Sequence, residues 1–284
     1  CVFKCYRFGW DDVQQAAKMY IKPNTASIVV VGNKDDVAAK LQRFAGNNEV
    51  TFLTPEGKTV SENDNPIPAG VTVQSIYDQY IKAIGGKEAI NNIKTVKWKM
   101  QTEVQGMTIS SERVMKLPDH LYEVQKMQGN MLSKKVYNGE AAQIQSPQGG
   151  SKLTEKKDLE EFVLDAKVVP EMHYEALGYT STLKSMEKVN DKDHYKVEVE
   201  TPSGDKLYNY YNAETGLKTQ QISSQKAQQR TVSITTSFKS YKPMSGVKFP
   251  TLIVVEGAMP MPLELNTTSI EINEDVDEAL FEIK

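Results

Sequence analysis

The chain has 284 residues, with 34 Lys and Arg against 37 Asp and Glu and a net charge of -3. This length allows one large domain or two ordinary ones. The two signs of charge are interspersed and no basic patch stands out, so we expect no nucleic-acid partner. No apolar run approaches the roughly 18 residues of a membrane-spanning helix.

Cysteine use and the start of the chain say little about its compartment. Cys1 and Cys5 are the only cysteines, and two cysteines four residues apart do not form a disulfide framework. A starting Met and a signal peptide are absent, which indicates a mature or excised piece. Cys1 is either the lipid-bearing first residue of a bacterial lipoprotein or simply the point where the piece begins.

The first sixty residues alternate between helical and strand patterns. The apolar spacing predicts helices over 10–21 and 35–44. The β-branched run 26–31 predicts a strand buried on both faces, and residues 50–53 predict a further short strand. Four such elements are too few to bury a good core alone, so the segment is typical of the end of a larger α/β domain.

Within this segment the pattern Asp12-Val13, Ala16-Ala17, Tyr20 and Pro23-Asn24, followed by IVVVG at residues 28–32, resembles the pitrilysin/insulinase-type zinc peptidases. The resemblance implies that residues 1–60 are the closing α/β fragment of such a peptidase. The metal motif of that family, His-x-x-Glu-His, is absent. His120, His173 and His194 stand alone, so we expect no catalytic residues, no metal site and no cofactor in this piece.

Residues 54–70 are rich in Pro, Gly, Asn and acids, which is typical of a linker. We therefore predict three parts: the fragment 1–60, a linker over 61–70 and a domain over 71–284.

The domain opens with a helix and then changes to a strand rhythm. Apolar residues at spacings of three and four predict a helix over 73–84, which Gly85-Gly86 ends. From Val96 to Val104 apolar and polar residues alternate, as in a strand with one buried and one solvent-exposed face. We expect this strand to begin a large antiparallel sheet that the preceding helix covers.

The same alternation continues almost to the end of the chain. Asn138-Gly139 is a strong hairpin signal. Two helical segments interrupt the strands, at 154–166 with Thr154 as its expected N-cap, and at 170–177. About ten strands with these interruptions predict an α+β fold, a strongly curved antiparallel sheet lidded by helices. The predicted strands after the first are 108–117, 121–127, 131–137, 141–145, 183–189, 195–199, 207–211, 217–223, 231–238, 247–255 and 263–272.

Several motifs of this domain occur in the same order in the LolA-like periplasmic lipoprotein carriers. They are the helix ending in Gly85-Gly86, the LGY at 177–179, the Thr-Gly-Leu at 215–217 and the final Asp-x-x-Leu-Phe-x-Ile at 277–283. The resemblance covers residues 71–284. It implies a half-open barrel whose concave face holds a lipid, a lipoprotein anchor or an apolar peptide, in the bacterial periplasm or outer envelope.

Six residues are candidates for contact with such a ligand. Trp98, Met100 and Met115 are in phase on the expected concave face, and Phe162 lies in the stripe of the helix over 154–166. Met259 and Met261 lie in a proline-flanked loop at 257–263, which would be a ligand-entry lip or a contact with a membrane or partner. The plainer interpretation makes the first four ordinary core residues and the loop a hairpin tip that packs on its own sheet.

Three functional hypotheses follow. In the first, the half-barrel is a non-catalytic module that binds an apolar ligand. In the second, it is an accessory domain that assembles with, or presents substrate to, a catalytic peptidase domain or subunit and has no ligand of its own. In the third, the piece is itself an enzyme, although no Ser-His-Asp or Cys-His set can be assembled from the sequence.

Overall fold

The computed structural model describes residues 9–21, 28–32, 34–45, 50–53, 66–227 and 230–283. The chain divides into two units, Cys1–Glu62 and Asn63–Lys284. Cys1, Cys5 and linker residues 54–65 lie outside the described residues.

The first unit contains two helices, α1 (Trp10–Tyr20) and α2 (Lys34–Ala45), where the sequence predicts them. The predicted strand over 26–31 is wrong for its described part. Residues 28–31 have no strand pairing, and Val29 and Val31 are 83% and 97% exposed. Of the residues described in this unit, only Leu53 forms a strand-type bridge. A β-branched run becomes a strand only beside a partner strand, and these residues have none.

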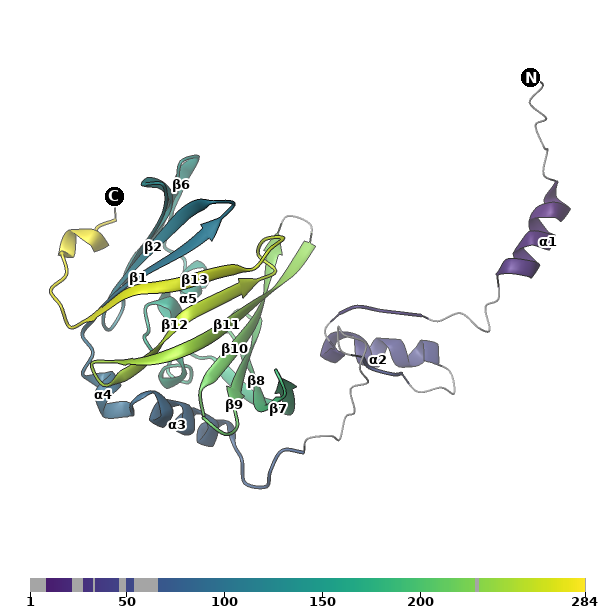
Figure 1. Ribbon diagram of the computed structural model, residues 1–284, viewed down its shortest axis with the longest axis horizontal. Coiled ribbons are helices and arrows are strands. Elements are labelled where there is room, and N and C mark those ends of the chain that lie inside the picture. The colour runs from purple at the N-terminus through teal and green to yellow at the C-terminus, as the bar shows by residue number, and fades with distance from the viewer. Residues whose placement is uncertain are drawn as a thin grey trace, which may run out of the picture. The chain divides into compact units, whose positions relative to one another are not determined.

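The second unit is built on one antiparallel sheet of thirteen strands (Figure 1). Its strand order is β6-β5-β4-β3-β2-β1-β13-β12-β11-β10-β9-β8-β7, so β6 and β7 are the two edges and the sheet does not close. The predicted curved antiparallel half-barrel is confirmed. The strands are β1 (Thr95–Val104), β2 (Met107–Lys116), β3 (His120–Met127), β4 (Asn130–Asn138), β5 (Ala142–Ser146), β6 (Gly149–Leu153), β7 (Thr180–Val189), β8 (Lys192–Glu200), β9 (Lys206–Asn212), β10 (Lys218–Ala227), β11 (Arg230–Met244), β12 (Val247–Glu256) and β13 (Leu263–Ile272).

Helices cover one face of this sheet. They are α3 (Val73–Ile84), α4 (Lys87–Asn91), α5 (Lys156–Asp165) and the 3-10 turn η2 (Pro170–Met172). A second 3-10 turn, η3 (Glu278–Phe281), contacts β3 and β4 near the end of the chain. The N-cap of α5 is Glu155, without a side-chain bond, so the expected cap at Thr154 is wrong.

Helix α3 is amphipathic, as its spacing predicts. The hydroxyl of Thr72 accepts a hydrogen bond from the amide of Ser75 and caps its start. Five residues of its apolar stripe are buried against the sheet, namely Ile76, Tyr77, Tyr80, Ile81 and Ile84. The covering role expected for this helix is therefore confirmed.

The contacts of α3 distinguish one end of the half-barrel from the other. Its C-terminal Gly85 lies against Gly246 in the β11–β12 turn, and Gln79 lies against Gly216 in the β9–β10 turn. We call this end of the half-barrel, with turns 117–119, 139–141, 190–191, 213–217 and 245–246, the base. We call the opposite end, with turns 105–106, 128–129, 147–148, 201–205 and 257–262, the rim. Helices α3 and α4 lie at the base in Figure 1.

Candidate functional site

The helix-covered face is closed by side chains in its base half. Tyr77 and Tyr80 of α3 pack on Tyr211 of β9, with ring centroids 5.8 and 5.5 Å apart. Phe162 of α5 packs 6.3 Å from Tyr137 of β4. Met115, Val96 and Leu121 complete this core beneath the helices. The base half of this face is therefore filled by its own side chains beneath the helices.

A buried ion pair lies inside this closed half. One carboxylate oxygen of Glu171, in η2, accepts from Lys218 Nζ at 2.7 Å and from the Tyr211 hydroxyl at 2.9 Å. The Glu171 side chain is 0% exposed and that of Lys218 is 10% exposed. Burial, and then the charge of Glu171, raise the pKa of Tyr211 well above its usual value, so the hydroxyl remains a donor at neutral pH.

The other Glu171 oxygen, Oε2, has no hydrogen-bond partner among the described atoms. A buried charge that is only partly hydrogen-bonded depends strongly on its counter-ion. We therefore assign Lys218 and Glu171 a structural role that connects η2 to the sheet.

A charged row crosses β1 to β4 where the helix cover ends. Cross-strand register places Trp98, Arg113, Glu123 and Lys135 side by side. Arg113 donates to Glu123 at 2.7 Å and lies 3.9 Å from Asp165 of α5. Lys135 donates to Glu161 of the same helix at 3.2 Å. On these four strands the row marks the edge of the closed core. On β8 and β9 the core reaches the rim, where Val199 and Leu207 are buried and Ser203 donates to Glu160 of α5 at 2.7 Å.

The Arg113–Glu123 pair predicts a pH dependence of stability. Burial raises the pKa of the Glu123 carboxyl, but the adjacent Arg113 outweighs it and the net pKa is lowered. A lowered folded-state pKa contributes stability that is present above the unfolded pKa of about 4.3 and lost as pH falls through the folded pKa. We expect Glu123→Gln to be less stable than the parent at pH 7, with the difference shrinking below about pH 4. Urea unfolding across this pH range measures it, and a constant difference would contradict it.

Nearer the rim than the charged row, this face is mostly polar on β1 to β3 and apolar on β11 to β13. On β1 to β3 the next row is Met100, Ser111 and Gln125, of which only Met100 is apolar. On β11 to β13 the register pairs Phe238 with Ile253, Ile253 with Leu265, and Val255 with Leu263. These five side chains are partly exposed and lie outside the closed core. We call Phe238, Ile253, Val255, Leu263 and Leu265 the apolar wall.

The apolar wall is on the same face as the helices. Phe238 lies 5.3 Å from the Lys218 ammonium, which itself lies 5.7 Å from Tyr80 of α3. Phe249, in phase with Ile253 on β12, packs edge-on against Trp98 at 5.8 Å. The wall therefore continues the core surface past the point where the helices stop.

The sequence-predicted ligand residues do not form one cluster. Trp98 is partly buried beside Phe249, with its indole NH bonded to Thr267 at 2.9 Å, and Met100 is 7% exposed opposite Thr267 of β13. Met115 and Phe162 are 3% and 4% exposed within the closed core. Met259 and Met261 are exposed in the β12–β13 turn. Ligand contact by these residues stays a prediction.

Sequence analysis did not identify the apolar wall, because alternation shows which residues share a face of the sheet but not which of them the helices cover. Ile253 and Val255 are in phase with Phe249, so the signal for their face was present. The length over which α3 and α5 shield the sheet depends on tertiary packing. Only the structure separates a shielded Met115 from an unshielded Ile253.

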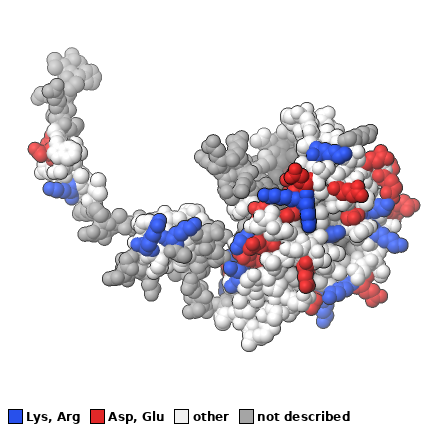
Figure 2. Space-filling model, turned by 180° about the vertical axis from the view of Figure 1, so that it is seen from behind, with Lys and Arg blue, Asp and Glu red and all other residues white. Residues whose placement is uncertain are grey.

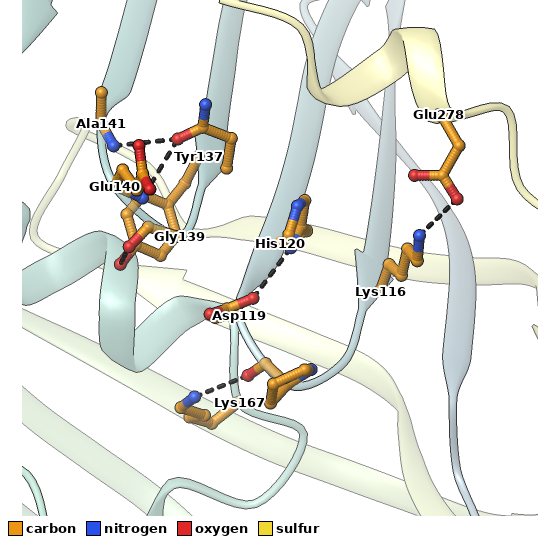
Figure 3. A network of polar contacts seen from close by, with 11 residues as sticks. Lys116, Asp119, His120, Tyr137, Gly139, Glu140, Ala141, Lys167 and Glu278 are labelled. Atoms are coloured by element: carbon orange, nitrogen blue, oxygen red, sulfur yellow. Dashed lines mark hydrogen bonds and ion pairs between the residues drawn. The ribbon is translucent and has the colours of Figure 1, made fainter.

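A second candidate is a hollow of about 450 Å³ at the base, lined by His120, Asn138, Glu278, Phe281, Glu282 and Ile283. The polar groups around it bond to one another (Figure 3). Asp119 contacts His120 Nδ1 at 2.8 Å, and Asn138 Oδ1 accepts from the amides of Glu140 and Ala141. Lys116 pairs with Glu278, and Lys167 donates to the Pro118 carbonyl at 2.6 Å. These contacts fix two turns and η3, so we assign them a structural role.

The described residues contain no group of three or more potential metal-ligating side chains. His120 and His194 are hydrogen-bonded through Nδ1, to Asp119 and to the Lys192 carbonyl. None of the described helices has the length and apolarity needed to cross a membrane. On the face shown in Figure 2, positive and negative side chains are interspersed.

No family model and no curated protein matches the chain. Solved structures do match its fold. A LolA superfamily protein of Nitrosomonas europaea aligns with a TM-score of 0.51 and 14% identity, over 75% of this chain and 99% of that one. A DUF1329 family protein of Desulfovibrio piger aligns with a TM-score of 0.51 and 14% identity, over 74% and 97%. The second unit therefore has the LolA-like half-barrel fold.

Proposed function

We propose that the half-barrel binds the acyl chain of a lipid or of a lipoprotein anchor against the apolar wall. The observation that carries the proposal is the apolar wall itself, five partly exposed side chains that continue the core surface beyond the helices. Burial of exposed apolar surface against an apolar ligand is favourable, because it removes that surface from water. The LolA-like fold supports the same choice of ligand.

The neighbouring charged row suits an amphiphile. An acyl chain on the apolar wall would place its polar end within reach of Ser111, Gln125 or Arg113. Part of the Arg113 guanidinium already donates to Glu123, so only its remaining N–H groups could donate to the polar end of a ligand. A location in the bacterial periplasm or outer envelope agrees with such a ligand.

Substitution on the two faces of β12 tests this function. Ile253 belongs to the apolar wall, whereas Leu252 points to the other face and is also partly buried. We expect Ile253→Glu to weaken binding of a fluorescent long-chain fatty acid at least roughly tenfold, because it places a charge against the chain. Leu252→Glu should change affinity by less than about twofold, since it leaves the apolar surface intact.

The titration uses the full chain, and circular dichroism confirms that both variants are folded. Equal losses in the two variants, or a parent chain that binds no fatty acid, would refute the proposal.

A second candidate function concerns the first unit. Helix α1 has no buried residue, and its Trp10, Met19 and Tyr20 are 77%, 57% and 80% exposed. This exposure favours a partner for α1. We propose that the partner is another chain or segment with which residues 1–60 complete a zinc-peptidase domain, and that the half-barrel is its accessory domain. Co-purification of a zinc-dependent peptidase with the full chain tests it. The proposal fails if Trp10→Ser leaves such an association unchanged.

A further inference from the structure

The turns at the rim of the half-barrel differ in charge from the turns at its base. The rim turns at 105–106, 128–129, 147–148 and 257–262 contain no Asp, Glu, Lys or Arg, and among the described rim turns only 201–205 has a charge, Asp205. The base turns carry Asp119, Glu140, Asp191 and Glu214. The turns at the two ends therefore differ in charge, while exposed charged residues flank both sets of turns, among them Glu103, Lys126 and Glu256 at the rim and Lys192 and Lys248 at the base.

Methionines gather at the rim. Chain topology brings five of the eleven methionines to the rim from three hairpins that are distant in sequence, and these are Met107, Met127, Met131, Met259 and Met261. In the second unit, four large apolar side chains are exposed among the described residues, and three of them are Met131 (37%), Met259 (43%) and Met261 (52%). The fourth, Ile67, precedes α3.

The turn that carries Met259 and Met261 is held in place at its root. A Cβ at Gly257 would lie 2.2 Å from the Ser233 carbonyl oxygen, so the chain leaves β12 in close contact with β11. Proline at positions 260 and 262 restricts the backbone around Met261. The two methionines are therefore presented to solvent by a constrained turn, directly beyond Val255 and Leu263 of the apolar wall.

We propose that the rim docks on a phospholipid bilayer, with Met259 and Met261 entering the interface between headgroups and acyl chains. Turns without charged side chains can be desolvated at this interface at little cost. Methionine adapts its shape to disordered chains. The inference rests on the proposed function for its purpose, because docking would place the apolar wall next to the source of its ligand.

Vesicle co-sedimentation of the full chain tests the docking. Vesicles of phosphatidylethanolamine and phosphatidylglycerol are used at about 0.1 M and about 1 M salt, between which the Debye length falls from roughly 10 to 3 Å. We expect the parent chain to bind at both salt concentrations, because the contact is apolar. The double variant Met259→Ser/Met261→Ser should lower the partition coefficient roughly tenfold or more, since both side chains lose apolar burial.

Met19→Ser is the matched control, because Met19 is 57% exposed but belongs to α1. It should leave vesicle binding unchanged. Absence of binding by the parent, loss of binding at high salt, or an equal loss in Met19→Ser would overturn the inference. Fatty-acid binding from solution without vesicle binding would refute the docking alone, whereas loss of both would refute the proposed function as well.

Discussion

Replacing Lys218 with methionine should lower the free energy of unfolding by about 3–5 kcal/mol, the usual cost of removing one partner of a buried ion pair. The Glu171 side chain is fully buried, and Lys218 is its only cationic partner among the described residues. One of its oxygens already lacks a hydrogen bond to any described residue. After the substitution the Tyr211 hydroxyl is the carboxylate's one remaining donor in the described part of the chain.

A double-mutant cycle separates the ion pair from the packing around it. Glu171→Leu combined with Lys218→Met removes both charges, so we expect the double variant to be more stable than Lys218→Met alone. Urea unfolding of the parent, the two single variants and the double variant measures the coupling. Additive losses, or a loss below about 1 kcal/mol in Lys218→Met, would show that the pair is not a dominant contact.

Alanine at Gly85 should destabilise the half-barrel by roughly 3 kcal/mol or more, because it combines backbone strain with a collision. Gly85 has φ of +135°, and a Cβ there would lie 2.3 Å from the Gly246 carbonyl oxygen. The atom it meets belongs to the backbone of the β11–β12 turn, so it cannot rotate away. The end of α3 would have to move off the base of the sheet.

Gly86 provides the control for this prediction. It also has a positive φ, +89°, but a Cβ there would meet nothing within 4 Å. Alanine at either position is strained, so the strain largely cancels in the comparison and the collision remains. We expect Gly86→Ala to be milder by at least about 2 kcal/mol in thermal or urea unfolding. Equal losses would mean that the contact between Gly85 and Gly246 is not tight.

The fold of the second unit could largely be predicted from alternation and turn residues. The alternation in β1 and the apolar stripe of α3 predict the buried faces that the structure shows for these two elements. Strand β6 was missed because Gly149-Gly150 normally ends a strand, yet here it pairs with Gln145 and Ser146 in β5. Pairing with a neighbour outweighed the local preference.

Burial and pairing that depend on distant residues were harder to predict than the strands and helices themselves. Nothing in the local sequence around Glu171 distinguishes it from a solvated acid, because its burial depends on Lys218, 47 positions later in the chain. Likewise, the strand expected over 26–31 needs a partner strand that the described residues of the first unit do not provide. Both cases depend on contacts distant in sequence, which periodicity does not encode.

Photo-crosslinking with a diazirine-bearing fatty acid, followed by peptide mapping, tests the central claim that the half-barrel binds an acyl chain at its apolar wall. We expect adducts on peptides of β11, β12 and β13 that contain Phe238, Ile253 or Leu265, and their suppression by an excess of unlabelled fatty acid. Adducts confined to the exposed helix α1, or adducts that no competitor suppresses, would contradict the claim.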